Sequence, residues 1–197
     1  MRAPLADMVA AGEQPFWRTD THWSSVGTAV LARRLAERLD PALAARLEVR
    51  KGQRSKTGDL TLLAGLDFDE EAASADVSAG GEVRESAGSD HWDEGTPVYG
   101  THRWTTAPSA GLVPGRTALV GDSFTYFALG NLRPLFAEGE FLWIAHPVAQ
   151  AQIVAGIVDA DTVVLETVQR SLTRSLLVSD TFYLAVKKAL AADVSPD

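Results

Sequence analysis

The feature that most constrains the fold of this chain is a strand that ends in a tight turn and continues as a helix, at residues 117–133. Residues 117–120 are apolar or small and predict a short buried strand; a Gly-Asp pair breaks it, and residues 124–135 have a helical pattern. Ser123 lies at the break, beside helix N-terminal N–H groups that can bind a developing oxyanion. The turn therefore suits a serine nucleophile. Thr125 replaces the second glycine of the G-x-S-x-G elbow, which argues against an α/β-hydrolase.

Strands and helices alternate after this turn. We expect strands at 141–145 and 162–166 and helices at 148–158 and 180–191. Strands that alternate with helices of about a dozen residues predict an α/β fold, here a three-layer α/β/α sandwich with a mostly parallel sheet. Ligands of such sheets bind beyond the carboxyl ends of the strands, where Ser123, Glu166 and Thr167 lie in this pattern.

The first half of the chain is predicted to be mainly helical. Ser24 or Ser25 is a suitable N-cap for a long helix that ends before residue 41. Shorter helices are expected at 4–11 and 41–47, followed by a charged, exposed segment at 48–57. A helical turn after Asp59 is expected to pack three leucines inward, namely Leu60, Leu62 and Leu63.

Residues 67–95 differ in composition from the rest of the chain. They are rich in acidic residues, alanine, serine and glycine, and they are too long for an ordinary tight connection. We expect a surface insertion or lid with little regular structure beyond one edge strand at 82–85. The length of 197 residues favours a single domain over residues 1–197.

The composition excludes several kinds of function. The chain has 18 Lys and Arg against 26 Asp and Glu, and a net charge of −8 argues against nucleic acid or an anionic membrane as the main partner. It has no cysteine, so disulfides, thiolate metal sites and cysteine nucleophiles are excluded. No apolar run of about 18 residues could span a membrane, and no signal-peptide core follows the N-terminus. A neutral or polyhydroxylic substrate is compatible with this composition.

A serine nucleophile needs a base that is oriented by a third group, and His22 is the best placed of the four histidines. Asp20 precedes it by two residues, and on an extended segment this spacing points both side chains to one face. Taken alone, Ser123 could equally be a helix N-cap, and the Asp-x-His block a capped helix start. Both lie at the start of a predicted helix, so their combination favours a catalytic set that folding brings together.

The histidines also permit a structural and a metal-binding interpretation. Three of them have no partner at triad-like spacing and are expected to be surface or structural side chains, namely His91, His102 and His146. The alternative for the Asp-His block is a zinc or manganese site with oxygen and imidazole ligands, from Asp20, His22, His91 and Asp93. No H-E-x-x-H or comparable cluster is present, so no metal is expected.

Four blocks along the chain resemble a known family: T-D-T-H-W at 19–23, G-D-L at 58–60, V-G-D-S-F at 120–124 and E-T-V-Q-R-S-L at 166–172. Together they are similar to the SGNH-hydrolase-like catalytic domain of the alginate O-acetyltransferases, the AlgX/AlgJ-like group. The resemblance implies that Ser123 is the nucleophile, His22 the base and Asp20 the group that orients it. Members of that group usually carry a further strand and helix before the segment aligned with residues 2–12, so this chain is expected to be N-terminally shortened.

The resemblance also implies an activity. We expect a serine-dependent O-acetyltransferase that acts on hydroxyls of an extracellular or cell-wall polysaccharide such as alginate, without a cofactor. The implied partners are the polysaccharide, an acetyl donor and a membrane-bound acyltransferase that supplies acetyl groups, in the cell envelope or outside the cell. A carbohydrate esterase with the same triad and a non-catalytic carbohydrate-binding scaffold are the alternatives.

The oxyanion hole is only half assigned. Asn131 is the only asparagine, and it lies eight residues past Ser123, about 12 Å along a helix, so it cannot serve the same oxygen. We expect the Ser123 N–H to be one donor. The candidates for the second donor or for substrate contact are Tyr126, Tyr99, Arg103 and Arg170, and Trp23 is a candidate aromatic face for a sugar ring.

Overall fold

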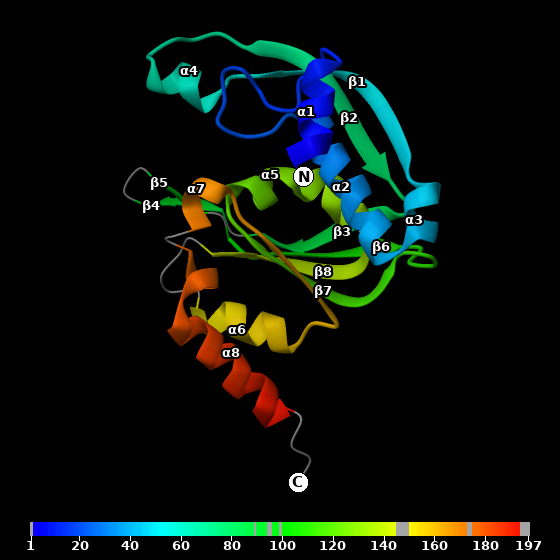
Figure 1. Cartoon of the computed structure of the whole chain (residues 1–197), viewed down its shortest axis with the longest axis vertical. Helices are drawn as coiled ribbons and strands as arrows, with labels where there is room; N and C mark the ends of the chain where they lie inside the picture. The colour runs from blue at the N-terminus through cyan, green and yellow to red at the C-terminus, as the bar shows by residue number, and fades with distance from the viewer. Residues whose placement is uncertain are drawn as a thin grey trace. The chain divides into compact units, whose positions relative to one another are not determined.

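The computed structural model describes residues 2–88, 90–93, 96–98, 100–144, 150–172 and 175–193 (Figure 1). The chain forms two compact units. The first comprises Met1–Glu82, Pro108–Val113 and Phe127–Leu135, and the second Val83–Ala107, Pro114–Tyr126 and Phe136–Asp197. Helix α5 (Ser123–Leu132) contributes Ser123–Tyr126 to the second unit and its remaining residues to the first.

The first unit combines helices with a two-stranded ribbon (Figure 1). Its elements are α1 (Arg2–Ala10), α2 (Ser25–Leu39), α3 (Pro41–Arg46), β1 (Glu48–Lys56), α4 (Asp59–Leu63), β2 (Glu70–Ser78) and the 3-10 helix η1 (Arg133–Leu135). The three helices predicted before residue 48 are confirmed. The expectation of little regular structure at 67–95 is wrong, because residues 70–78 form β2, which pairs antiparallel with β1 from Glu48↔Ser78 to Lys56↔Glu70.

Helix α2 buries small side chains. The Ser24 hydroxyl accepts a hydrogen bond from the Gly27 N–H at 3.3 Å and caps the helix, as the sequence predicts. Its most buried positions are Gly27, Thr28, Ala29, Ala32 and Ala36. Small residues allow close approach to β2 and α3, against which α2 packs. Gly27 is required because a Cβ there would lie 2.2 Å from the Pro15 carbonyl oxygen.

Helix α4 forms where the sequence predicts a turn of helix, but the inward packing expected of its leucines is wrong. Leu60 is 43% exposed, Leu62 64% and Leu63 82%. The helix is held by its polar start instead. The Leu60 N–H donates to the Thr19 carbonyl at 3.0 Å, and the Asp59 carboxylate accepts a bond from the Thr21 N–H at 2.8 Å.

The second unit is built on a five-stranded sheet in the order β3-β6-β8-β7-β9. Two of its strands, β3 and β7, each begin with a residue of the first unit. Its elements are β3 (Glu82–Ala87), β4 (His91–Asp93), β5 (Thr96–Val98), β6 (His102–Ala107), β7 (Val113–Gly121), β8 (Phe136–Trp143), α6 (Gln150–Val158), β9 (Thr162–Glu166), α7 (Gln169–Leu172), the 3-10 helix η3 (Leu176–Val178) and α8 (Asp180–Asp193). Strand β7 pairs parallel with β9, whereas β6 pairs antiparallel with β8. The fold is α/β as predicted, but the sheet is mixed and not mostly parallel in these pairings. The edge strand expected at 82–85 is confirmed as β3.

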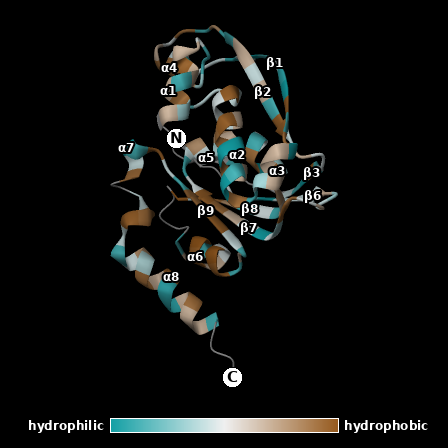
Figure 2. Cartoon of the chain, turned by 45° about the vertical axis from the view of Figure 1, so that its right-hand side comes forward, coloured by the Kyte–Doolittle hydropathy of each residue, from teal (hydrophilic) through white to brown (hydrophobic). Residues whose placement is uncertain are grey.

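The core of the second unit supports the end of β7. Ala118 and Val120 of β7 point to one face of the sheet, where they pack with Leu142 of β8, Ile153 of α6 and Phe182 of α8. Figure 2 shows the hydrophobic character of α6 and β9. The serine turn therefore follows a strand whose last residues are fully buried. Within the described part of the chain, no helix has the length and apolar character needed to cross a membrane.

Candidate active site

Residues 15–24 form a closed loop at the start of α2, in the first unit. Phe16 and Trp23 pair across it as an isolated antiparallel bridge, and their rings stack with centroids 6.0 Å apart. The Ser24 N–H donates to the Pro15 carbonyl at 3.0 Å and closes the base of the loop. Trp23, a candidate sugar-binding face, is only 8% exposed and packs on Phe16. The Asp-His block thus lies, in sequence, between the two residues that close this loop.

Asp20 and His22 form the hydrogen-bonded pair that the sequence predicts. The Asp20 Oδ1 lies 2.7 Å from the His22 Nδ1 and also accepts a bond from the His22 backbone N–H at 2.8 Å. Both side chains are buried. The segment is a bend and not the extended strand from which the pairing was predicted. The side chains meet because the carboxylate folds back onto the backbone two residues ahead, as aspartate does in turns.

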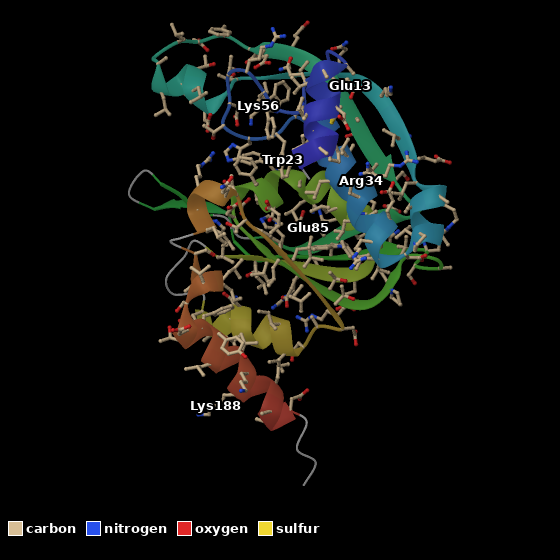
Figure 3. All side chains as sticks on the ribbon, in the orientation of Figure 1. Glu13, Trp23, Arg34, Lys56, Glu85 and Lys188 are labelled. Carbon is tan, nitrogen blue, oxygen red and sulfur yellow. The ribbon has the colours of Figure 1, made fainter. Side chains whose placement is uncertain are left out.

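Lys56, at the end of β1 and labelled in Figure 3, completes the environment of the carboxylate. Its ammonium lies 2.5 Å from the Asp20 Oδ2, which also accepts a bond from the Asp59 N–H at 3.2 Å. Burial acts to raise the pKa of Asp20, but the bonds from His22 and Lys56 outweigh it and hold the pKa well below its usual range. The Lys56 ammonium and the His22 ring both face the Phe127 ring, at 4.5 Å and 4.2 Å from its centroid. Asp20 is therefore ionised across the physiological pH range.

Asp59 brings a third potential ligand atom to this cluster, since the ligand atoms of Asp20, His22 and Asp59 lie within 4.8 Å of one another. These atoms are already engaged: Nδ1 bonds Asp20, and Asp59 accepts bonds from the N–H and hydroxyl of Thr21 at 2.8 and 2.5 Å. Lys56 also places its positive charge on Asp20. The arrangement favours a base held by a carboxylate over a cation site. The side chains of His91 and Asp93, ligands in the metal alternative, lie outside the described residues.

Ser123 is the first residue of α5 and follows β7 by two residues, in the second unit. The residue that caps the helix is its neighbour, because the Asp122 Oδ1 accepts a bond from the Phe124 N–H at 2.8 Å and the Asp122 carbonyl accepts one from the Tyr126 N–H at 3.1 Å. The interpretation of Ser123 as the N-cap is therefore wrong. Its hydroxyl and N–H lie at the positive end of a helix, where an oxyanion is stabilised.

Carboxyl groups from two neighbouring strand ends meet at this turn. The Asp122 Oδ2 accepts bonds from the Thr167 hydroxyl and the Val168 N–H, both at 2.8 Å. The Glu166 Oε2 accepts a bond from the Thr125 hydroxyl at 2.5 Å. Burial raises the pKa of Glu166 to about 7; the negative charge of Asp122 adds to the rise, and the Thr125 bond opposes it. The sequence pattern placed Glu166 and Thr167 at a strand end but did not indicate this contact.

The candidate oxyanion or substrate-contact residues occupy different environments in the second unit. The Tyr126 hydroxyl donates to the Asp90 carboxylate at 2.7 Å. The Arg103 Nε donates to the buried Glu140 at 3.1 Å. The Arg170 guanidinium lies over the ring of Phe124, the residue after Ser123, at 5.2 Å from its centroid. Of these three, Arg170 is the one whose charge the structure places on the serine helix. Tyr99 lies outside the described residues.

His102 is a polar centre that sequence reasoning missed. It is buried, its Nδ1 is hydrogen-bonded to the Glu85 carboxylate, and its Nε2 lies 2.8 Å from the Asp90 Oδ1. Of the two roles expected for His102, surface or structural, the structure shows the structural one. Partners 17 and 12 residues away on other segments leave no local signal in the sequence. His146 and the His91 side chain lie outside the described residues.

A known family matches the first half of the chain. Residues 1–100 match the family model described as SGNH hydrolase-like domain, acetyltransferase AlgX. This range includes the Asp20–His22 pair, Lys56 and Asp59. No curated protein matches the sequence.

Solved structures resemble the chain at low sequence identity. A DHHW family protein from Eubacterium siraeum is 12% identical, with a TM-score of 0.54 over 90% of this chain and 65% of its own. Bacillus cereus PatB1 is 13% identical, with a TM-score of 0.51 over 86% and 65%, and it has also been solved with a sulfonyl adduct. The O-acetyltransferase domain of Pseudomonas putida AlgJ is 18% identical, with a TM-score of 0.49 over 95% and 65%. The chain spans about 65% of the length of these structures, and the first two share its fold.

Proposed function

This protein belongs to the SGNH hydrolase-like family of the acetyltransferase AlgX, whose model matches half of the chain, and from that premise we propose that it is a serine-dependent O-acetyltransferase. The acceptors would be hydroxyl groups of an extracellular or cell-wall polysaccharide, alginate among them. The observation that carries the proposal is the buried Asp20–His22 pair, with Nδ1 held at 2.7 Å by a carboxylate that Lys56 keeps ionised. This pair is the base and orienter that a serine nucleophile requires.

The proposed reaction has two halves, acetylation of Ser123 and transfer of the acetyl group to the sugar, and in each half one proton passes between Ser123 and His22. His22 Nε2 takes the Ser123 hydroxyl proton as Oγ bonds to the acetyl carbon, and it then gives that proton to the leaving group of the donor. In the second half, Nε2 takes the proton of a sugar hydroxyl as its oxygen attacks the acetyl carbon. The bond to Oγ breaks, and the proton returns to Ser123. The Asp20 charge stabilises the imidazolium in both halves.

The oxyanion is assigned to the Ser123 N–H at the start of α5, with Arg170 as the leading candidate for a second donor. Its guanidinium is held on the Phe124 ring, and Arg103 and Tyr126 have carboxylate partners of their own. We further propose that helices cover both faces of the sheet as in SGNH hydrolases. We place the protein in the cell envelope or outside the cell, where a membrane-bound acyltransferase would supply acetyl groups. No cofactor enters this scheme.

The first test is covalent labelling. Incubation with 4-nitrophenyl acetate, followed by intact mass measurement, is expected to show a single acetyl adduct on the wild type. Ser123→Ala should show none, and the exposed Ser109→Ala serves as the matched control. PatB1 carries a sulfonyl adduct in one structure, so an arylsulfonyl fluoride is a second probe of the nucleophile. An adduct that persists in Ser123→Ala would refute the assignment.

The second test separates transfer from hydrolysis. The acetylated protein is mixed with oligomers of mannuronic acid or of N-acetylglucosamine, and products are measured by mass spectrometry. Acetylated oligosaccharide supports the proposed transferase. Free acetate alone identifies an esterase with the same residues, because water then resolves the acyl-enzyme. If no adduct forms while oligosaccharide binding is retained, the protein is a binding module.

A further inference from the structure

Two carboxyl groups flank the serine turn from the ends of two parallel strands, and the reaction described above uses neither. Asp122, after β7, is fully engaged: Oδ1 accepts from the Phe124 N–H, and Oδ2 accepts from Thr167 and Val168. These three bonds, all at 2.8 Å, satisfy an ionised carboxylate. Glu166, at the end of β9, holds the Thr125 hydroxyl at 2.5 Å. Ser123 therefore lies in sequence between Asp122 and Thr125, both of which are held by side-chain hydrogen bonds.

The packing at this point leaves almost no room for movement. A Cβ on Gly121 would lie 1.8 Å from the Thr125 hydroxyl oxygen and 2.8 Å from the Glu166 carbonyl oxygen. The last residue of β7, the last residue of β9 and the first turn of α5 therefore meet within van der Waals distance. Because Thr125 sits in the first turn of α5, its bond to Glu166 fixes the turn that carries the hydroxyl and N–H of Ser123.

The protonation state of Glu166 affects the serine turn because Asp122 carries a negative charge beside it. The negative charge of Asp122 acts on the Glu166 carboxyl group. Arg170, four residues after Glu166, places its guanidinium over the Phe124 ring. With burial and the Asp122 charge raising its pKa to about 7, Glu166 is in good part the neutral acid at neutral pH. Above that pH a second negative charge appears beside Asp122, and the two strand ends repel each other.

We propose that Glu166 is a positioning residue for Ser123, which acts through Thr125 to hold the first turn of α5 in its reactive geometry. This inference rests on the proposed function, in which Ser123 is the nucleophile. Loss of the Glu166–Thr125 bond moves the attacking oxygen and its oxyanion donor without removing a group that binds substrate. Acylation is therefore expected to slow while KM changes little, since small displacements of reacting groups cost up to about 100-fold in rate.

The test compares Glu166→Ala and Glu166→Gln with the exposed Glu138→Gln as control. Acylation of Ser123 by 4-nitrophenyl acetate is followed as burst rate and KM. Glu166→Ala should acylate about tenfold more slowly or worse at unchanged KM. Glu166→Gln keeps a neutral acceptor for Thr125 and should restore the rate to near that of the wild type. It should also lack the loss of acylation that the wild type shows above about pH 7, the pKa of Glu166.

Thr125→Val and Thr125→Ser keep the inference testable if Glu166→Ala does not fold, as judged by circular dichroism. The valine variant removes the hydroxyl and should slow acylation, whereas the serine variant retains the bond and should not. A Glu166→Ala or Thr125→Val protein that folds and acylates at the rate of Glu138→Gln would overturn the positioning role. That outcome is distinct from failure of the proposed function, in which the wild type itself shows no acetyl adduct at Ser123.

Discussion

Asn131 provides the sharpest test of how the first unit is held together. It lies on α5 and is 4% exposed. Its Oδ1 accepts a bond from the Val77 N–H at 2.8 Å, and its Nδ2 donates to the Thr28 hydroxyl at 2.7 Å and to the Ser25 and Ala75 carbonyls at 3.0 Å. Two N–H protons serve three acceptors, so one of these bonds is shared. A single amide thus ties α5 to α2 and β2.

We predict that Asn131→Ala destabilises the protein by about 4 kcal/mol. Val77 and Ala75 are each 5% exposed, so the Val77 N–H and the Ala75 carbonyl would be left unsatisfied away from water. Each such group costs about 2 kcal/mol, and the small cavity adds to the loss. Asn131→Asp keeps the acceptor for Val77 but turns a carboxylate toward the carbonyls of Ser25 and Ala75. The pKa of the introduced carboxyl is therefore raised in the folded state, and this variant should become relatively less stable as the pH rises.

Urea unfolding followed by circular dichroism measures the loss, with the exposed Gln53→Ala as a matched amide control expected within about 0.5 kcal/mol of the wild type. Hydrogen exchange at the Val77 amide shows where the stability is lost, because that N–H loses its acceptor in Asn131→Ala and should exchange faster. A loss below about 1 kcal/mol together with unchanged Val77 exchange would refute the reasoning, since this is no more than one ordinary hydrogen bond contributes.

Three further predictions concern single side chains. The pKa of Glu166 rises from 4.5 to about 7 on folding, so between these pH values the folded state holds a proton that the unfolded state has lost. The free energy of unfolding should therefore fall by about 3 kcal/mol as the pH rises through that interval. Urea midpoints measured across this range should fall for the wild type and not for Glu166→Gln. Gly58→Ala places a Cβ 1.9 Å from the Thr19 carbonyl oxygen, so we expect a loss of more than about 3 kcal/mol and slower Ser123 acylation, checked by thermal melting and burst kinetics. Leu63→Ser should change the unfolding free energy by less than about 0.5 kcal/mol, because Leu63 is 82% exposed; a larger loss would mean that it is buried in solution.

The elements that the sequence predicts well are those that local signals specify. Helix α2 follows from the Ser24 cap and the helical period, and β9 from a run of β-branched residues at 162–164 followed by a leucine. Local sequence signals do not predict an element that forms only because it pairs with a segment distant in the chain. Strand β2 is rich in alanine, serine and acid, and it forms because its backbone pairs with β1 along nine residues. The leucines of α4 follow a helical pattern, but the pattern alone does not say whether their face of the helix is buried, and in the structure they are exposed.

Sheet topology is also invisible to local reasoning. Alternating strands and helices favour parallel pairing, and β7 and β9, which have α5, β8 and α6 between them in the chain, pair in this way. Strand β6 pairs antiparallel with β8, 33 residues further on at its nearest register pair, Thr105↔Glu138. No hairpin turn joins the two strands, so no turn signal marks the pairing. The mixed character of the sheet therefore depends on tertiary packing.

The candidate site shows the same division. Asp20 and His22 are two residues apart, so their pairing is predictable from sequence, whereas the hold of Lys56 on Asp20 depends on the end of β1. At the serine turn the sequence offers two good caps in succession, Asp122 and Ser123, and propensity does not choose between them. The structure gives the cap to Asp122 through the Phe124 N–H. The carboxylate accepts the capping bond, so the nucleophile hypothesis for Ser123 no longer competes with the capping one.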